Sequence, residues 1–114
     1  MRSIKILLFA SLALGCGGYE DSIIAPGAAN PVDAIGETAW SPATITIKVG
    51  EQVTFRNSSN IVHNVQFDAG TNAPPADIGD FGNGSRPVTF AATGTFAYHC
   101  GIHPNMQGQV IVQP

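Results

Sequence analysis

Apolar and polar residues alternate along much of the chain after residue 40, which is the pattern of β-strands with one buried face. Residues 43–49, for example, place Ile45, Ile47 and Val49 on one side and two threonines and a lysine on the other. Turn residues separate these segments, and none shows the period of an amphipathic helix. The alternation predicts strands at residues 43–49, 52–57, 62–67, 88–91, 95–100 and 107–112.

These short strands predict an all-β fold, a Greek-key β-sandwich or barrel. The chain has 114 residues, enough for one compact domain and too few for two. We expect residues 68 to about 86, with Pro74-Pro75 and Gly82-Asn83-Gly84, to form one long loop. Within it, Asp80-Phe81-Gly82 spells the magnesium motif of protein kinases, but a chain this short lacks every companion element of a kinase.

The first fifteen residues have the pattern of an export signal. Arg2 and Lys5 give a charged start, residues 6–14 are mostly apolar, and small residues precede Cys16. The apolar stretch is too short to cross a bilayer as a helix. The alternative is a helix or strand buried in the domain, but nothing amphipathic follows it. We therefore expect a signal peptide at residues 1–15 and export to the periplasm.

Cys16 ends a segment, Leu12-Ala13-Leu14-Gly15-Cys16, that resembles a bacterial lipoprotein cleavage box. There the cysteine becomes the lipidated first residue, although Ala13 stands where leucine is usual; the alternative is a cysteine discarded with the signal. Residues 16–38 are rich in small residues without a period and predict a flexible tether. The folded domain is then expected at residues 39–114, with Ile23-Ile24 as an alternative first strand.

The charge balance excludes nucleic acid as a partner. The whole chain has a net charge of −3. Without its first fifteen residues it keeps three basic residues (Lys48, Arg56 and Arg86) against all eight acidic ones, a net charge of −5. No cluster of lysine or arginine remains that could neutralise phosphates.

Cys100 is the single cysteine of the predicted domain. Alternation through residues 95–100 places Phe96, Tyr98 and Cys100 on one face, so the sulfur points into the core. A disulfide with Cys16 is formally possible in an oxidising compartment. It would, however, join the tether to a motif whose thiolate needs to be free.

Three further residues can converge on this sulfur. His103 and Met106 follow Cys100 at intervals of three, in a loop that can fold back around the sulfur. His63 interrupts a segment otherwise suited to the core, where an imidazole is costly unless its nitrogens find partners. Singly, each residue has an ordinary structural explanation. Together they reproduce the His₂Cys set with a weak axial Met of a blue-copper centre, and thiolate with thioether favours copper over zinc. His99, on the opposite face, is expected at the surface.

The segments HNV at residues 63–65 and YHC-x-x-HP-x-M at residues 98–106 resemble the cupredoxins of the plastocyanin and amicyanin type. The resemblance covers roughly residues 40–112 and implies that Asn64 braces the two ligand loops and donates its backbone N–H to the cysteine sulfur. It also implies one type 1 copper ion, held by His63, Cys100, His103 and Met106.

Ile102 departs from the family, which usually carries proline immediately before the second histidine. Unlike proline, isoleucine has a backbone N–H. We hypothesise that this amide gives the Cys100 sulfur a second hydrogen bond, which would raise the reduction potential.

Four protein ligands leave no open position for a substrate, which argues against hydrolytic or Lewis-acid chemistry. We therefore expect a one-electron carrier that catalyses nothing itself. Transient redox protein partners would dock near His103, beside Ile102 and Pro104, and a monomer is the simplest state.

Three other functions can be compared with electron transfer. A periplasmic copper carrier or storage protein would hold exchangeable, weakly coloured Cu(I). A subunit or piece of a copper oxidase or nitrite reductase would need further histidines, and only His99 is left over; a dinuclear centre would need a second cysteine in the loop. A purely adhesive β-sandwich would leave the ligand set unexplained.

Overall fold

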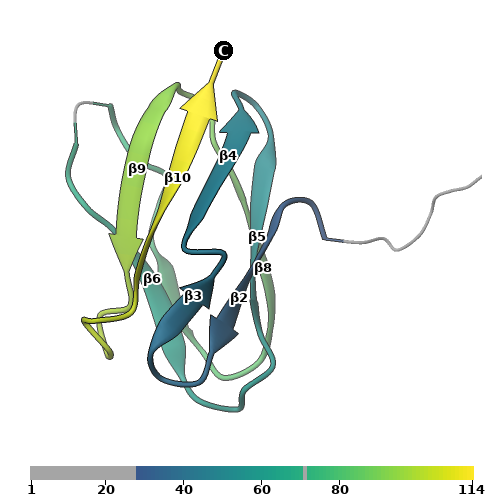
Figure 1. The fold of residues 1–114 in the computed structure, drawn as a ribbon, viewed down its shortest axis with the longest axis vertical. Helices are drawn as coiled ribbons and strands as arrows, with labels where there is room; N and C mark the ends of the chain where they lie inside the picture. Colours follow the sequence, from purple (N-terminus) through teal and green to yellow (C-terminus); the bar gives the residue numbers. More distant parts are fainter. Residues whose placement is uncertain (1–27, 71) are drawn as a thin grey trace, which may run out of the picture.

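A computed structural model describes residues 28–70 and 72–114 of the protein (Figure 1). These residues form nine β-strands and no helix, so the predicted all-β class is confirmed. No helix long and apolar enough to cross a membrane occurs among them. The predicted signal peptide at residues 1–15 and Cys16 lie outside the described residues.

Two sheets form a β-sandwich, as predicted (Figure 1). One has the strand order β4-β10-β9-β6-β7 and the other β3-β2-β5-β8. β10 pairs in parallel with β4 and antiparallel with β9, and β2 pairs in parallel with β5. The strands are β2 (Pro31–Ile35), β3 (Ala39–Ser41), β4 (Thr44–Lys48), β5 (Gln52–Asn57), β6 (His63–Phe67), β7 (Ile78–Phe81), β8 (Gly84–Thr89), β9 (Gly94–His99) and β10 (Gln107–Gln113).

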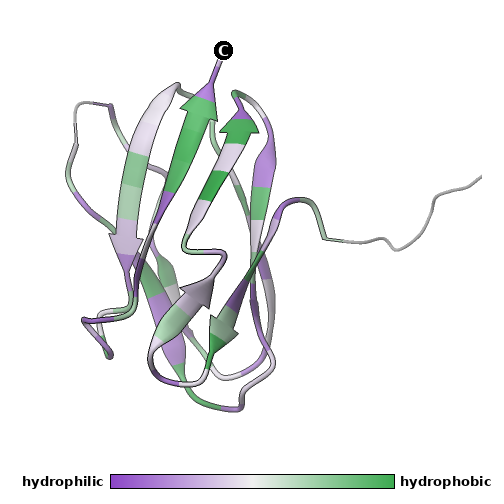
Figure 2. Ribbon diagram, in the orientation of Figure 1, coloured by the Kyte–Doolittle hydropathy of each residue, from purple (hydrophilic) through white to green (hydrophobic). Residues whose placement is uncertain are grey.

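The core lies between the sheets and follows the predicted alternation, which appears in Figure 2 as apolar and polar bands along the strands. On β9, Phe96 and Tyr98 are buried, and Cys100 follows them into the core. Aromatic side chains from the two sheets meet edge to face, with Phe55 of β5 5.1 Å from Tyr98 between ring centroids. Such pairs stabilise a core beyond the area that they bury.

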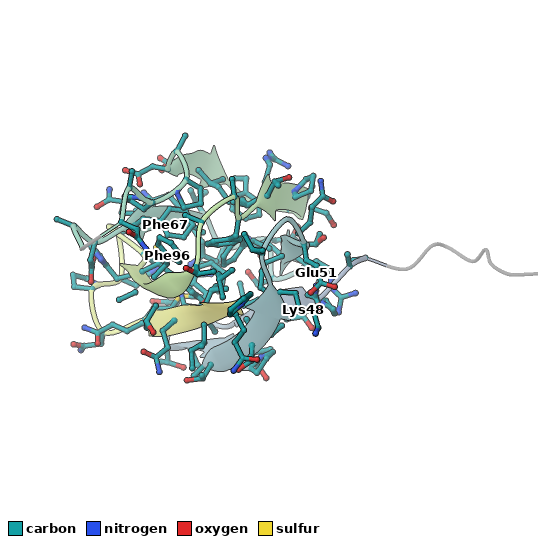
Figure 3. All side chains as sticks on the ribbon, turned by 90° about the horizontal axis from the view of Figure 1, so that it is seen from above. Lys48, Glu51, Phe67 and Phe96 are labelled. Atoms are coloured by element: carbon teal, nitrogen blue, oxygen red, sulfur yellow. The ribbon has the colours of Figure 1, made fainter. Side chains whose placement is uncertain are left out.

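Charged residues lie at the rim of the sandwich. Figure 3 looks onto the end that is uppermost in Figure 1, with Phe67 and Phe96 among the packed side chains and Lys48 and Glu51 at the edge. There the Glu51 carboxylate accepts the Lys48 backbone N–H at 2.8 Å and closes the turn between β4 and β5. The opposite end, lowermost in Figure 1, carries the loop between β9 and β10, which contains the Cys100–Met106 segment.

The structure contains three strands that the sequence did not predict, β2, β3 and β7. Pro31–Ile35, assigned to the tether, form β2, which places Val32 and Ala34 in the core. The long loop expected at residues 68–86 contains β7 and the start of β8. β2 and β7 each combine few inward-facing apolar residues with a proline or a glycine, so their alternation is not recognisable in the sequence.

Gly108 of β10 is held by close packing against Tyr98. A Cβ at this position would overlap the Tyr98 hydroxyl and lie 3.0 Å from the Ala43 carbonyl oxygen. We expect Gly108→Ala to lower the free energy of unfolding of the metal-free protein by about 1–3 kcal/mol, as overpacking does in cores. Urea unfolding followed by fluorescence measures this change.

Gly79→Ala is the matched control, because no heavy atom lies within 4 Å of a Cβ built on Gly79. This variant should unfold within about 0.5 kcal/mol of the wild type. Equal midpoints for Gly108→Ala and the wild type would contradict the packing described here.

Candidate metal centre

Three of the predicted ligand residues converge at the lower end of the sandwich. His63 Nδ1 and His103 Nδ1 each lie 3.8 Å from Cys100 Sγ and 3.2 Å from each other. His63 and Cys100 are fully buried, whereas the His103 side chain is 20% exposed. Within residues 28–70 and 72–114, this is the one group of three or more His, Cys, Asp or Glu side chains whose ligand atoms lie within 4.8 Å of one another.

Two neighbouring strands of one sheet bring His63 and Cys100 together. His63 is the first residue of β6, and its register with β7 shifts between His63 and Val65. Such irregularities re-aim a side chain relative to a regular strand. Cys100 directly follows β9, so it continues the inward face of that strand. Because β6 pairs with β9, the two side chains meet inside the sandwich.

The segment from Cys100 to Met106 folds back on itself, as the sequence predicted. The Cys100 backbone N–H donates to the Met106 carbonyl at 3.0 Å, and the Met106 N–H donates to the His103 carbonyl at 2.8 Å. The Trp40 indole N–H also donates to the Met106 carbonyl, at 3.2 Å. The Met106 side chain is fully buried, so its thioether is held at this end of the core.

Asn64 joins the two ligand segments, as expected from the family resemblance. Its backbone N–H donates to Cys100 Sγ at 3.4 Å. Its side-chain oxygen accepts the Gly101 N–H at 2.7 Å. Asn64 of β6 is therefore hydrogen-bonded both to the Cys100 sulfur and to the Gly101 amide, the first amide of the loop that follows Cys100.

The predicted second amide bond to the sulfur is wrong. Among the described residues, Asn64 is the one whose backbone N–H bonds Cys100 Sγ, and the Ile102 amide does not. Ile102 lies in the outer part of the loop, and its side chain is 45% exposed. The consequence for the reduction potential that we attached to this residue therefore has no structural basis.

Burial favours the neutral form of the His63 ring. Loss of water lowers the pKa of His63, and the nearby His103 adds to this, whereas the Gly36 backbone and the Glu37 carboxylate act in the opposite direction. His63 Nδ1 faces the Cys100 sulfur, at 3.8 Å. Neutral imidazole is the form that binds metals, so burial prepares this ring for a metal ion.

Glu37 is a site residue that sequence reasoning missed, because it fell in the predicted tether. Its carboxylate oxygen lies 3.8 Å from His103 Nε2, on the outer edge of the ring. A hollow of about 290 Å³ opens there. It is lined by Glu37, Thr38, Ile102, His103, Pro104 and Asn105. His103 is thus the ligand candidate that a partner molecule can approach.

His99 is not part of the cluster, as predicted. Its Nδ1 lies 2.9 Å from Asp68 Oδ1, and its side chain is 33% exposed. The position on β9 faces away from Cys100, as the alternation requires.

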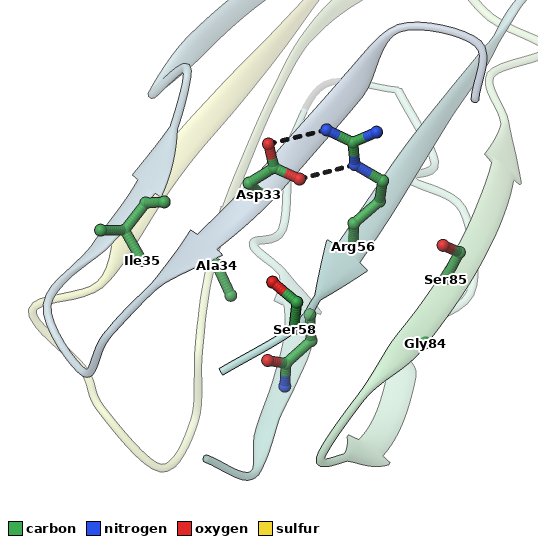
Figure 4. A pocket seen from close by; sticks show the side chains of 8 residues that line it. Asp33, Ala34, Ile35, Arg56, Ser58, Gly84 and Ser85 are labelled. Carbon is green, nitrogen blue, oxygen red and sulfur yellow. Dashed lines mark hydrogen bonds and ion pairs between the residues drawn. The ribbon is translucent and has the colours of Figure 1, made fainter. Parts of the chain in front are cut away.

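A second hollow, on the four-stranded sheet, offers no comparable ligand set (Figure 4). Its one carboxylate, Asp33, accepts two hydrogen bonds from Arg56, at 2.6 and 2.8 Å. Hydrogen bonding to Arg56 lowers the pKa of Asp33, partly opposed by burial. The hollow is lined by Asp33, Ala34, Ile35, Arg56, Asn57, Ser58, Gly84 and Ser85.

The chain is similar in sequence and structure to small copper proteins. A model of copper-binding proteins of the plastocyanin/azurin family matches residues 27–113. Chloroplastic plastocyanin of Chlamydomonas reinhardtii is 34% identical over 123 residues, covering 99% of this chain and 81% of the relative. Amicyanin-alpha of Methylorubrum extorquens is 33% identical over 106 residues, covering 91% and 88%. A solved structure of an oxidized amicyanin variant matches with a TM-score of 0.68 and 32% identity, covering 79% of this chain and 86% of that one.

Trp40 and Tyr98 are buried aromatic residues on the core side of the cluster. Trp40 lies 6.0 Å from His63 and 5.9 Å from Tyr98 between ring centroids. The Tyr98 hydroxyl is buried without a hydrogen-bond partner, and burial raises the pKa of Tyr98. A buried polar group without a partner costs stability, whereas a bonded one does not.

Substitutions of these two residues should change stability in opposite directions. Trp40→Phe removes the bond to the Met106 carbonyl and part of the ring volume, so the free energy of unfolding of the metal-free protein should fall by about 2–4 kcal/mol. Tyr98→Phe removes only the unpartnered hydroxyl, so it should leave that free energy equal or higher. Urea unfolding measures both. A clear loss of stability in Tyr98→Phe would show that the hydroxyl is bonded in solution and contradict this prediction.

Proposed function

The chain belongs to the plastocyanin/azurin family of copper-binding proteins, and on this premise we propose that it carries single electrons between periplasmic redox partners. One type 1 copper ion is the cofactor of this family and supplies the Cu(II)/Cu(I) couple when bound. The observation that carries the proposal is the approach of two imidazole nitrogens to one buried cysteine sulfur.

His63, Cys100 and His103 would hold the copper ion, and the Met106 thioether would be a fourth, weak ligand. The spacing of the donor atoms supports this. For metal bonds of about 2.0 Å to nitrogen and 2.3 Å to sulfur, a trigonal site separates N from S by about 3.7 Å and N from N by about 3.5 Å. The corresponding separations here are 3.8 Å and 3.2 Å. Within the described residues, the two Nδ1 atoms lie within hydrogen-bond distance only of each other and of the Cys100 sulfur. A bound metal ion would explain why these three polar atoms face one another.

The surroundings favour electron transfer over substrate chemistry. Three of the four side chains, His63, Cys100 and Met106, have no exposed surface, so a substrate cannot reach the ion past them. Hydrogen bonds from Asn64 and within the loop hold the ligand segments through contacts that do not involve the metal. A fixed ligand set changes little between two oxidation states, which keeps the barrier to electron transfer low.

The exposed edge of His103 is the proposed route for the electron. Three exposed apolar residues, Ile35, Val62 and Ile102, lie on segments that reach this end of the sandwich (Figure 1). Together with the hollow beside His103 they offer a docking surface for a redox protein that binds transiently. Export to the periplasm and anchoring through a lipid on Cys16 are part of the proposal and are supported by the pattern of the first sixteen residues.

Visible absorption and EPR after addition of Cu(II) test this proposal. We expect an intense blue band and narrow copper hyperfine splitting in the wild type, because both report a short copper–thiolate bond. Cys100→Ser should lose both signals. His99→Gln should keep both, since His99 lies on the other face beside Asp68.

The other outcomes separate the alternatives. A protein that binds copper without the blue band would favour a periplasmic copper carrier or storage protein. Absence of copper binding would contradict the metal assignment itself.

A further inference from the structure

β7 lies where the sequence predicted a loop, and it brings Asp80 to Asn64. β7 pairs antiparallel with β6, with His63 opposite Phe81. Asp80 Oδ1 accepts a hydrogen bond from Asn64 Nδ2 at 2.9 Å. Asn64 is 9% exposed, whereas Asp80 lies at the surface. The carboxylate thus contacts the residue that joins the ligand segments.

The carboxylate determines which way the Asn64 amide faces. A side-chain amide has a donor end and an acceptor end, whereas an ionised carboxylate only accepts. With Asp80 on one side, the NH₂ group faces Asp80 and the oxygen faces the Gly101 N–H, at 2.7 Å. A reversed amide would set oxygen against oxygen at Asp80 and donor against donor at Gly101.

The charge of Asp80 is not neutralised by a neighbour. Among the described residues, the acid–base pairs within 4 Å are Asp33 with Arg56, Asp68 with His99 and Glu37 with His103. Asp80 belongs to none of them, and its bond to Asn64 is the side-chain hydrogen bond that it makes. Hydrogen bonds to an ionised acceptor are stronger than neutral ones.

We propose that Asp80 is a positioning residue for the copper site. It fixes the Asn64 amide so that Asn64 holds Gly101, and with it Cys100, against β6. The effect on copper rests on the proposed function, whereas the hydrogen bonds themselves join residues of the chain to one another.

Amide hydrogen exchange of the metal-free protein, followed by NMR, tests the inference without copper. Asp80→Ala should speed exchange of the Gly101 N–H about fivefold, the factor expected for loss of one ordinary hydrogen bond. Asp80→Asn should lie between this variant and the wild type, because an amide can face Asn64 with either end.

Asp77→Ala is the matched control. Asp77 is also exposed, lies next to β7, and accepts the Phe67 N–H at 2.9 Å. This variant should speed exchange at Phe67 and leave Gly101 unchanged. Equal Gly101 exchange in the wild type and Asp80→Ala would overturn the proposal, whether or not the chain binds copper.

The reduction potential of the copper-loaded protein provides the readout that a general loss of stability would not move. Both Asp80 variants remove the same negative charge, which raises the potential equally. Asp80→Ala loosens the donation from Asn64 to the sulfur more than Asp80→Asn does, so its potential should lie below that of Asp80→Asn. Equal potentials in the two variants would show that Asp80 acts by charge alone and would overturn its positioning role.

Discussion

The tie between Asn64 and the segment Cys100–Gly101 is the constraint on which the candidate centre depends. The two sides of the site come from positions 36 residues apart, and this one asparagine spans them with its backbone N–H and its side-chain oxygen. The sulfur is buried at the end of β9, where water cannot stabilise a thiolate. A donated N–H replaces part of that lost hydration, and at the same time it sets where the sulfur lies relative to His63.

The aromatic core holds the candidate ligands in position by packing against the strands that carry them. Trp40, Phe55 and Tyr98 contact one another edge to face, so two strands of one sheet are packed onto the strand that leads to Cys100. The Trp40 N–H fixes the Met106 carbonyl, which also closes the ligand loop on the Cys100 amide. The same packing removes water from His63 and favours the neutral ring that a metal needs. One densely packed end of the sandwich therefore accounts for the position of the proposed ligands and favours the neutral form of His63.

Much of the candidate site could be predicted from the sequence because it depends on period and spacing. Alternation along β9 places Cys100 with Phe96 and Tyr98, and intervals of three bring His103 and Met106 into the same loop. The fold class followed from the same alternation in the longer strands. This alternation is visible in the sequence because each strand with one buried face needs apolar residues at every second position.

The rest could not be predicted because it depends on tertiary contacts. β2 and β7 contain proline, glycine or aspartate among few apolar residues, so no period is recognised there. Glu37 and Asp80 therefore lie in segments that the sequence predicts as a tether and a loop. The Ile102 hypothesis was wrong for a related reason. The presence of an N–H follows from residue type, but its direction follows from the loop conformation, which the hydrogen bonds among Cys100, His103 and Met106 decide.

We infer that the protein, and not the metal, fixes the ligand geometry. Crystal structures of the metal-free and Cu(II)-loaded protein, superposed on the strands β5, β6 and β9, test it most directly. We expect Cys100 Sγ and the two Nδ1 atoms to occupy the same positions in both structures, with the bonds of Asn64 intact. A loop from Cys100 to Met106 that takes another course without copper would contradict it.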